Sequence, residues 1–224
     1  MTDRGSNSPT PTQFPAPRLT AILDVEACAA RGFDPIDTLR AFVAGGATFV
    51  QLRAKPLPGG AFLDLAGRAV ELAHAAGARL IVNDRADVAA LSGADGVHVG
   101  QDDLGPADAR RLLGSAAIVG LSTHTTDQLE RALDAPVSYV AIGPVFATAT
   151  KATGYDAVGL TMVRRAAART AARGLPLVAI GGMTLDHAPA VIDAGAASVA
   201  VIGDLLTGGD PERRVREYVR TLGV

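Results

Sequence analysis

The sequence predicts a (β/α)8 barrel, the TIM-barrel class of α/β fold. Eight short apolar runs alternate with helix-like segments, and a glycine recurs where a helix passes into the next strand. The length of 224 residues fits one such barrel. A doubly wound open sheet is the main alternative, but the first strand-to-helix turn lacks the Gly-x-Gly-x-x-Gly pattern typical of that fold.

The expected strands are short apolar runs spread over the whole chain after residue 18. In order they are Leu19–Leu23, Thr48–Leu52, Arg79–Val82, Gly96–Val99, Ile118–Leu121, Tyr139–Ile142, Leu177–Ile180 and Ser198–Ile202. Between them, segments such as Ala61–Ala76 and Leu160–Arg173 carry apolar residues at spacings of three and four, which predicts helices.

A local pattern repeats where a helix should end and a strand begin. Ala44-Gly45-Gly46-Ala47, Ser92-Gly93-Ala94-Asp95 and Ala194-Gly195-Ala196-Ala197 precede the second, fourth and eighth expected strands. Glycine can adopt the left-handed conformation that ends a helix, and a following alanine allows a tight turn into the sheet. Residues 18–224 are therefore expected to form a single barrel domain.

Composition excludes several classes of protein. Residues 1–17 combine proline with Ser, Thr, Asn and Gly and lack the apolar core of a signal peptide, so we expect a disordered tail. A net charge of −2 argues against nucleic-acid binding, and no apolar stretch is long enough for a membrane span. The single Cys28 cannot form an internal disulfide, which favours the cytoplasm. A homo-oligomer is left open.

Lysine is rare in this chain and stands at two places only. Of the 21 basic residues, Lys55 and Lys151 are lysines and the rest are arginines. Each lysine follows an expected strand, where the active groups of a barrel gather. The flat guanidinium of arginine does not replace a compact ammonium at every site. Codon bias and chance are the alternative explanation.

Acidic and basic residues meet at the ends of neighbouring expected strands. Asp84 and Asp103 are close enough in a barrel to share Mg²⁺, which favours one or two carboxylates together with water and phosphate oxygens. Arg53, Lys55 and Lys151 could meet the remaining phosphate charge. Alternatively, each aspartate caps the helix that follows it. With three cations on the same rim, a metal–diphosphate site is favoured.

A second anion site is expected after the seventh and eighth strands. Barrels commonly bind a monophosphate there through backbone amides, and Gly181-Gly182 and Ile202-Gly203 would permit a close approach. Thr148 and Thr150 would add hydroxyl donors. No Ser-His-Asp arrangement stands out, so Ser122 is interpreted as a hydrogen-bond donor rather than a nucleophile. His98 and His124 are interpreted as structural, and His74 and His187 as helix-surface residues.

Two anion sites suit a reaction that joins an activated diphosphate to a phosphorylated acceptor. From about Leu19 to Leu222 the chain also resembles the thiamine phosphate synthase family. The motifs that carry the resemblance are Gln51-Leu52-Arg53-Ala54-Lys55, Asn83-Asp84-Arg85, Val97-His98-Val99-Gly100-Gln101-Asp102-Asp103, Thr148-Ala149-Thr150-Lys151 and Ile180-Gly181-Gly182.

The resemblance implies that 4-amino-5-hydroxymethyl-2-methylpyrimidine diphosphate and a carboxylated thiazole phosphate are joined, with diphosphate leaving first. It implies Mg²⁺ on Asp84 and Asp103, and catalytic roles for Lys55, Ser122 and Lys151. The implied contacts of the pyrimidine diphosphate are Gln51, Leu52, Arg53, Ala54, Lys55, Asn83, Ser122 and Lys151. The implied contacts of the thiazole phosphate are Thr148, Ala149, Thr150, Gly182, Ile202 and Gly203.

The chain departs from the family at two positions. Gly203 stands where the family usually has Ser, and the first strand lacks the aromatic residue common there. Two other functions remain open. A related thiazole tautomerase would not need Lys55, Asp84 and Asp103 together, and a non-catalytic barrel that binds thiamine phosphates would not need a metal.

Overall fold

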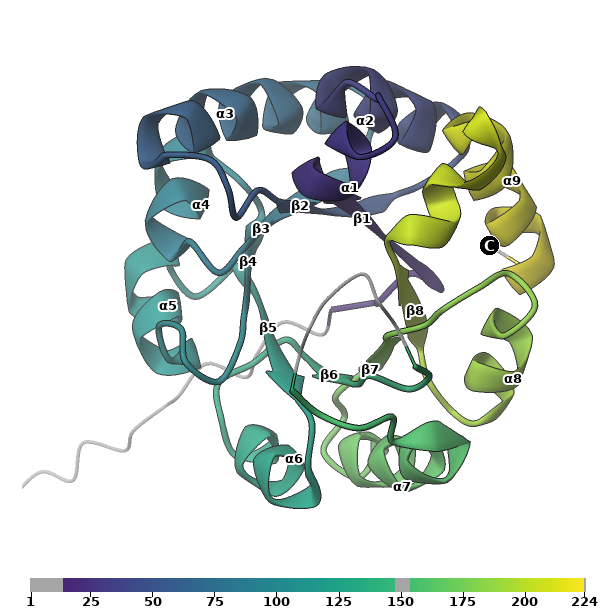
Figure 1. Cartoon of the computed structure of the whole chain (residues 1–224). Coiled ribbons are helices and arrows are strands. Elements are labelled where there is room, and N and C mark those ends of the chain that lie inside the picture. Colours follow the sequence, from purple (N-terminus) through teal and green to yellow (C-terminus); the bar gives the residue numbers. More distant parts are fainter. Residues whose placement is uncertain (1–13, 148–153, 224) are drawn as a thin grey trace, which may run out of the picture.

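Eight parallel strands close into a barrel in the order β1 to β8, and β8 pairs with β1 (Figure 1). The computed structural model describes residues 14–147 and 154–223. The strands are β1 Leu19–Asp24, β2 Phe49–Arg53, β3 Arg79–Asn83, β4 Gly96–Val99, β5 Ile118–Thr123, β6 Tyr139–Ile142, β7 Leu177–Ile180 and β8 Ser198–Val201. All eight predicted strands are present, and the predicted fold class is confirmed.

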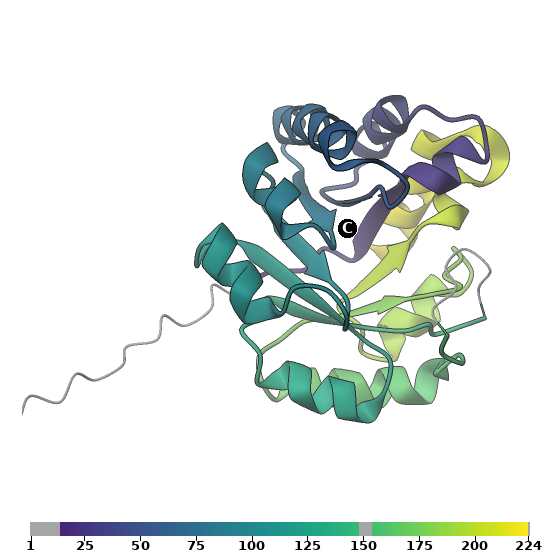
Figure 2. The ribbon, with the colours of Figure 1, turned by 60° about the vertical axis from the view of Figure 1, so that its left-hand side comes forward.

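Helices follow the strands and surround the barrel, as Figure 2 also shows. The α-helices are α1 Val25–Ala29, α2 Pro35–Ala44, α3 Gly59–Ala75, α4 Ala86–Ser92, α5 Pro106–Leu113, α6 Thr126–Leu133, α7 Gly159–Ala171, α8 Ala188–Asp193 and α9 Pro211–Leu222, with a 3₁₀ segment η1 at Gly203–Gly209. The predicted helices match α3 and α7 to within two residues. In the described part of the chain, no helix has the length and hydropathy needed to cross a membrane.

The glycine junctions predicted from the sequence are confirmed. Gly46, Gly93 and Gly195 have φ values of 100°, 72° and 101°, in the left-handed region that favours glycine. At the other end of α2, the Asp34 side chain accepts hydrogen bonds from two backbone N–H groups, and a proline occupies the first turn. The Asp34 side chain satisfies backbone N–H groups that have no partner within the helix, and the proline removes one such group. Both residues therefore fix the start of α2.

Two apolar layers form the core. One lies between the strands and the helices and includes Val50 and Leu52, whereas Phe49, Ile81 and Tyr139 belong to a smaller cluster inside the barrel. Because side chains alternate along a strand, residues two positions beyond an interior residue also point inward. Thus Gln51, Asn83 and Ser122 follow Phe49, Ile81 and Gly120 on the inner face, above an apolar floor.

Phe14 lies at the base of the barrel, within the segment that the sequence analysis assigned to the tail. Its side chain is buried, and its ring centroid lies 5.0 Å from that of Phe49 and 5.6 Å from that of Tyr139. Phe14 therefore belongs to the packed structure, and helps to close the end of the barrel opposite to the carboxyl ends of the strands.

Gly120 makes room for the largest polar residue in the barrel interior. A Cβ atom at this position would lie 2.2 Å from Cζ of Tyr139 and 2.6 Å from Nδ1 of His98. Contacts that short do not occur, so any side chain on Gly120 would displace the Tyr139 ring. A glycine on β5 thus permits Tyr139 and His98 to meet across the barrel.

Candidate functional site

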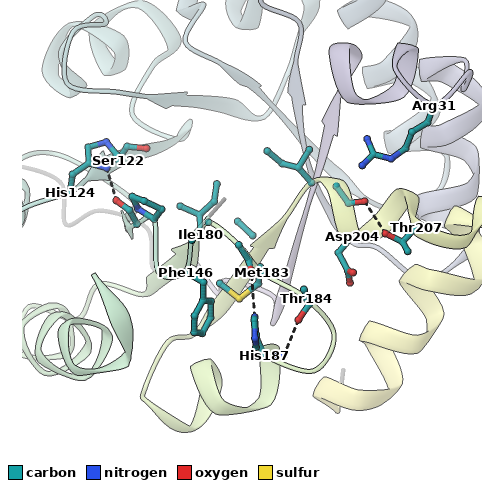
Figure 3. Close-up of a pocket in the computed structure, with 18 residues that line it drawn as sticks. Arg31, Ser122, His124, Phe146, Ile180, Met183, Thr184, His187, Asp204 and Thr207 are labelled. Carbon is teal, nitrogen blue, oxygen red and sulfur yellow. Dashed lines mark hydrogen bonds between the residues drawn. The ribbon is translucent and has the colours of Figure 1, made fainter. Parts of the chain in front are cut away.

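Two cavities open at the carboxyl ends of the strands and share a wall. The larger, of about 430 Å³, lies over β5 to β8, and Figure 3 shows its lining side chains. The smaller, of about 200 Å³, lies over β2 to β5. Ser122 and His124 line both. Cavities of a few hundred Å³ at this face are where barrel enzymes bind their ligands.

The smaller cavity contains two carboxylates and an ammonium. Nζ of Lys55 lies 3.2 Å from Oδ2 of Asp84, and Asp103 lines the same cavity. Asp103 Oδ2 accepts a hydrogen bond of 2.7 Å from the Gly100 N–H group, which fixes the carboxylate against the loop after β4. The structure therefore brings together three of the charged residues that the sequence predicted at this rim.

Asp84 has an unusual backbone conformation. Among the described residues other than glycine, it alone has a positive φ, of 66°. Its N–H group donates a 2.8 Å hydrogen bond to the His98 carbonyl group of the next strand. A left-handed conformation costs free energy in a residue that has a Cβ atom, and it is found where the surrounding structure needs a side chain held in one direction.

The two carboxylates fit a cation. Burial raises the pKa of the Asp84 carboxyl above its ordinary value, and the neighbouring Asp103 carboxylate raises it further, while Lys55 opposes this shift. A divalent cation would remove the repulsion that disfavours the charged form. Mg²⁺ often uses only one or two protein carboxylates, together with water and substrate oxygens. Within the described residues, no group of three or more His, Cys, Asp or Glu side chains could hold a metal ion.

Neither aspartate caps the helix that follows it, so the alternative interpretation of these residues does not hold. The residue before α4 is Arg85 and the residue before α5 is Gly105, and neither helix has a side-chain cap. Both carboxylates are instead directed to the cavity or to the loop that forms it.

A chain of hydrogen bonds runs from the barrel interior to the wall between the cavities. The Tyr139 hydroxyl group lies 2.8 Å from Nδ1 of His98, and Nε2 of His98 lies 2.8 Å from Oγ of Ser122. Burial raises the pKa of the Tyr139 phenol, so the phenol stays protonated. Gln101 also donates to the Ser122 carbonyl group, at 2.7 Å. Ser122 is therefore held from two sides.

The larger cavity is bounded by the loops after β6 and β7. A Cβ atom on Gly182, whose φ is 63°, would lie 2.6 Å from the Ala147 carbonyl oxygen. His187 lies 3.1 Å from the Gly182 carbonyl oxygen through Nδ1 and stacks on Phe146 with a centroid distance of 4.2 Å. Glycine is thus required at 182 because the loops after β6 and β7 approach each other closely. This requirement holds whether or not a ligand also approaches Gly182.

The residues predicted on β2 divide between the two faces of the barrel. Lys55 lines the smaller cavity, whereas Leu52 and Ala54 are buried in the layer between the strands and the helices. Gln51 is buried on the inner face. Arg53 forms ion pairs with Asp24 and Glu26, and its buried Nε has no hydrogen-bond partner within the described residues. Arg53 is not among the described lining residues of either cavity.

The other predicted site residues either line at least one of the two cavities or lie outside the described residues. Asn83 and Ser122 line the smaller cavity, and Ser122, Gly182, Ile202 and Gly203 line the larger one. Thr148, Ala149, Thr150 and Lys151 lie outside the described residues. His74 is on the surface of α3, where it contacts Asp95, as predicted from the sequence.

Some lining residues carried no recognisable sequence signal. His187 is exposed at the start of α8, as expected, but it also lines the larger cavity. Arg31 reaches the same cavity from the segment between α1 and α2, which follows the end of β1. Tyr139 lies in an apolar run, and only the packing of the barrel reveals that its hydroxyl group meets His98.

Comparisons with known proteins agree with one another. The family described as thiamine monophosphate synthase (TMP-TENI) matches residues 19–205. Thiamine-phosphate synthase of Koribacter versatilis (strain Ellin345) is 45% identical over 213 residues, which cover 92% of this chain and 96% of that protein. The same-named protein of Anaeromyxobacter dehalogenans (strain 2CP-C) is 46% identical over 183 residues, covering 81% and 80%.

A solved structure gives the same picture. The thiamine phosphate pyrophosphorylase of Pyrococcus furiosus superposes with a TM-score of 0.82 at 26% identity. The superposition covers 92% of this chain and 95% of that chain.

Proposed function

The chain belongs to the thiamine monophosphate synthase family, and from this membership and its two adjoining cavities we propose how it joins a pyrimidine to a thiazole to form thiamine phosphate. The proposed substrates are 4-amino-5-hydroxymethyl-2-methylpyrimidine diphosphate and a thiazole phosphate, carboxylated or not. The bond between the pyrimidine methylene carbon and the diphosphate oxygen breaks, and the thiazole nitrogen forms a new bond to that carbon. A carboxylated thiazole also loses CO₂.

One observation carries this proposal. The two cavities differ in chemistry but meet at Ser122 and His124. The smaller cavity has charged groups suited to a diphosphate, and the larger has the loops after β7 and β8 that commonly bind a monophosphate. Two substrates bound in this way would place their reacting ends on either side of Ser122.

Departure of the diphosphate is the step that the smaller cavity serves. In the proposed dissociative mechanism the diphosphate leaves with the electron pair of the broken C–O bond, and the pyrimidine ring stabilises the remaining cation. Lys55 lines this cavity and would bind a diphosphate oxygen as a point charge. The family resemblance implies a further contact from Arg53. Lys151 is expected to contribute a second ammonium.

Asp84 and Asp103 would hold Mg²⁺. When bound, the ion would neutralise negative charge that builds up on the leaving diphosphate. The left-handed conformation of Asp84 and the hydrogen bond from Gly100 to Asp103 would keep both carboxylates directed to the same point before the ligand arrives.

Ser122 would orient the substrates at the junction. If the Tyr139 phenol donates to Nδ1 of His98, the proton of His98 resides on Nε2 and is donated to Oγ of Ser122. The Ser122 hydroxyl proton is then directed outward, towards an acceptor on the pyrimidine or on the diphosphate. No protein nucleophile is required, because the thiazole nitrogen attacks the cation directly.

A related thiazole tautomerase and a non-catalytic barrel that binds thiamine phosphates are the alternative functions. Formation of thiamine phosphate from the two substrates would exclude both. Incubation with both substrates and Mg²⁺ should form thiamine phosphate and diphosphate in equal amounts, and omission of either substrate should prevent both. A protein that binds thiamine phosphate but releases no diphosphate would refute the proposal. We also expect a cytoplasmic enzyme, in keeping with Cys28, which is buried and free.

A further inference from the structure

The described lining of the larger cavity includes one permanently positive side chain. Among its described lining residues, Arg31 is the only arginine or lysine. The acidic residue in the same lining, Asp204, accepts hydrogen bonds from Arg214 and from the Tyr218 hydroxyl group, so its charge is met from outside the cavity. The charge of Arg31 is therefore available to a ligand.

The contacts of Arg31 leave most of its donors unused. Its side chain is exposed, and one guanidinium nitrogen donates to the Ala27 carbonyl group at 3.2 Å. No ion pair joins Arg31 to an acid within the described residues, in contrast to Arg53 and Arg214. In Figure 3 the guanidinium group extends from the segment after α1 towards the cavity. A guanidinium with free edges can bind a phosphate through two parallel hydrogen bonds.

We propose that Arg31 binds the phosphate group of the thiazole substrate. This inference rests on the proposed function and deepens it. Gly203 and Thr207, from the segment after β8, line the same cavity. The Gly203 N–H group suits the same phosphate, and so would the Thr207 hydroxyl group on turning away from the Gly203 carbonyl oxygen, to which it donates at 3.3 Å. Arg31 would supply the charge that these neutral donors lack.

The position of Arg31 distinguishes the phosphate from the carboxylate of the substrate. Arg31 and Ser122 lie on opposite sides of the cavity in Figure 3. The carboxylate of a carboxylated thiazole is attached beside the reacting nitrogen, which must lie near Ser122. The phosphate is carried on a flexible two-carbon chain on the other side of the ring. Arg31, on the far side of the cavity from Ser122, therefore matches the phosphate, which lies far from the reacting nitrogen.

The test compares Arg31→Ala with Arg40→Ala, which removes an exposed arginine of α2 that lines neither cavity. Binding of the thiazole phosphate, with and without its carboxylate, is measured by calorimetry, and KM is measured for each substrate. Loss of a hydrogen-bonded charge pair should weaken thiazole phosphate binding at least about tenfold. The KM for the pyrimidine diphosphate and the unfolding midpoint should stay the same, and Arg40→Ala should match the wild type. Arg31→Lys should restore part of the binding.

Several results would overturn the inference. Unchanged thiazole phosphate affinity in Arg31→Ala would do so, as would a loss confined to the carboxylated thiazole, since Arg31 would then bind the carboxylate. An equal rise in both KM values would also overturn it, since Arg31 would then support the structure as a whole rather than bind the thiazole phosphate. If the wild-type protein binds thiazole phosphate through Arg31 but forms no thiamine phosphate, the proposed function fails while the assignment of Arg31 stands.

Discussion

Nε2 of His98 lies 2.8 Å from Oγ of Ser122, and this hydrogen bond links the interior of the barrel to the wall shared by the two cavities. The other ring nitrogen of His98 contacts the buried Tyr139 hydroxyl group at 2.8 Å. Ser122 is thus oriented by His98, which lines the smaller cavity, and through His98 by the buried Tyr139. Such support fixes a functional side chain before the ligand binds, and so reduces the cost of reaching the reactive geometry.

Tyr139→Phe should lower kcat roughly tenfold while the fold persists, because Ser122 would be less firmly oriented. The loss of one buried hydrogen bond should also reduce the free energy of unfolding by about 1 kcal/mol. Steady-state kinetics and urea unfolding measure the two effects. Thr20→Val provides the control, since it removes the buried hydrogen bond of 2.9 Å between Thr20 and Ser198, neither of which lines either cavity. Equal kinetic losses in both variants would contradict a specific role for Tyr139.

Asp84→Asn and Asp103→Ala should each reduce Mg²⁺-dependent coupling by more than about 100-fold, since the ion would lose one of its two carboxylates. Asparagine tolerates the positive φ of residue 84, so the first variant should fold. Mg²⁺ with diphosphate should raise the unfolding midpoint of the wild type and of Asp87→Asn, which changes an exposed acid paired with Arg85. The same rise in Asp84→Asn or Asp103→Ala would rule out the metal assignment.

Lys151→Arg should reduce kcat/KM about tenfold although the charge is kept, because a planar fork does not fit a site built for a compact ammonium. The role of Lys151 follows from the resemblance and from the rarity of lysine in this chain. Lys55→Arg should behave similarly, because Lys55 lies 3.2 Å from Asp84. The opposite exchange at an exposed position, Arg40→Lys, serves as control. Wild-type kcat/KM in Lys151→Arg would argue against a point-charge role.

Gly182→Ala should destabilise the protein by about 1–3 kcal/mol and raise the KM for thiazole phosphate, because its Cβ atom would press on Ala147. Gly174→Ala is a matched control. Gly174 has a similar φ of 67°, but a Cβ atom there meets no atom within 4 Å. It should show only the conformational cost and normal kinetics. Urea unfolding and KM values would separate the conformational cost from the cost of the contact with Ala147. Identical behaviour of both variants would show that this contact has no effect.

The barrel was predictable because its signals are local. Strands are apolar runs, and glycines such as Gly46 and Gly195 stand where helices end, so the eight strands could be located within one or two residues. The neighbouring positions of Asp84 and Asp103 were predictable for a related reason. Consecutive parallel strands bring their carboxyl ends together, so sequence order gives spatial order.

The remaining features depend on packing across the barrel. Gly120 is separated from Tyr139 by a whole helix, and nothing in either segment indicates that one makes room for the other. Arg31 reaches the larger cavity from the segment after α1. The distinction between Leu52, which packs under the helices, and Lys55, which lines a cavity, requires the register of β2 and the path of the chain after it.

A crystal structure with thiamine phosphate, diphosphate and Mg²⁺ tests the central claim most directly. That claim is that each cavity binds one substrate and that the two meet at Ser122. Diphosphate should occupy the smaller cavity beside Lys55, with Mg²⁺ on Asp84 and Asp103, and the thiazole phosphate group should lie in the larger cavity beside Arg31. The newly formed carbon–nitrogen bond should then lie next to Ser122. Both products in one cavity, or the diphosphate beside Arg31, would contradict the account.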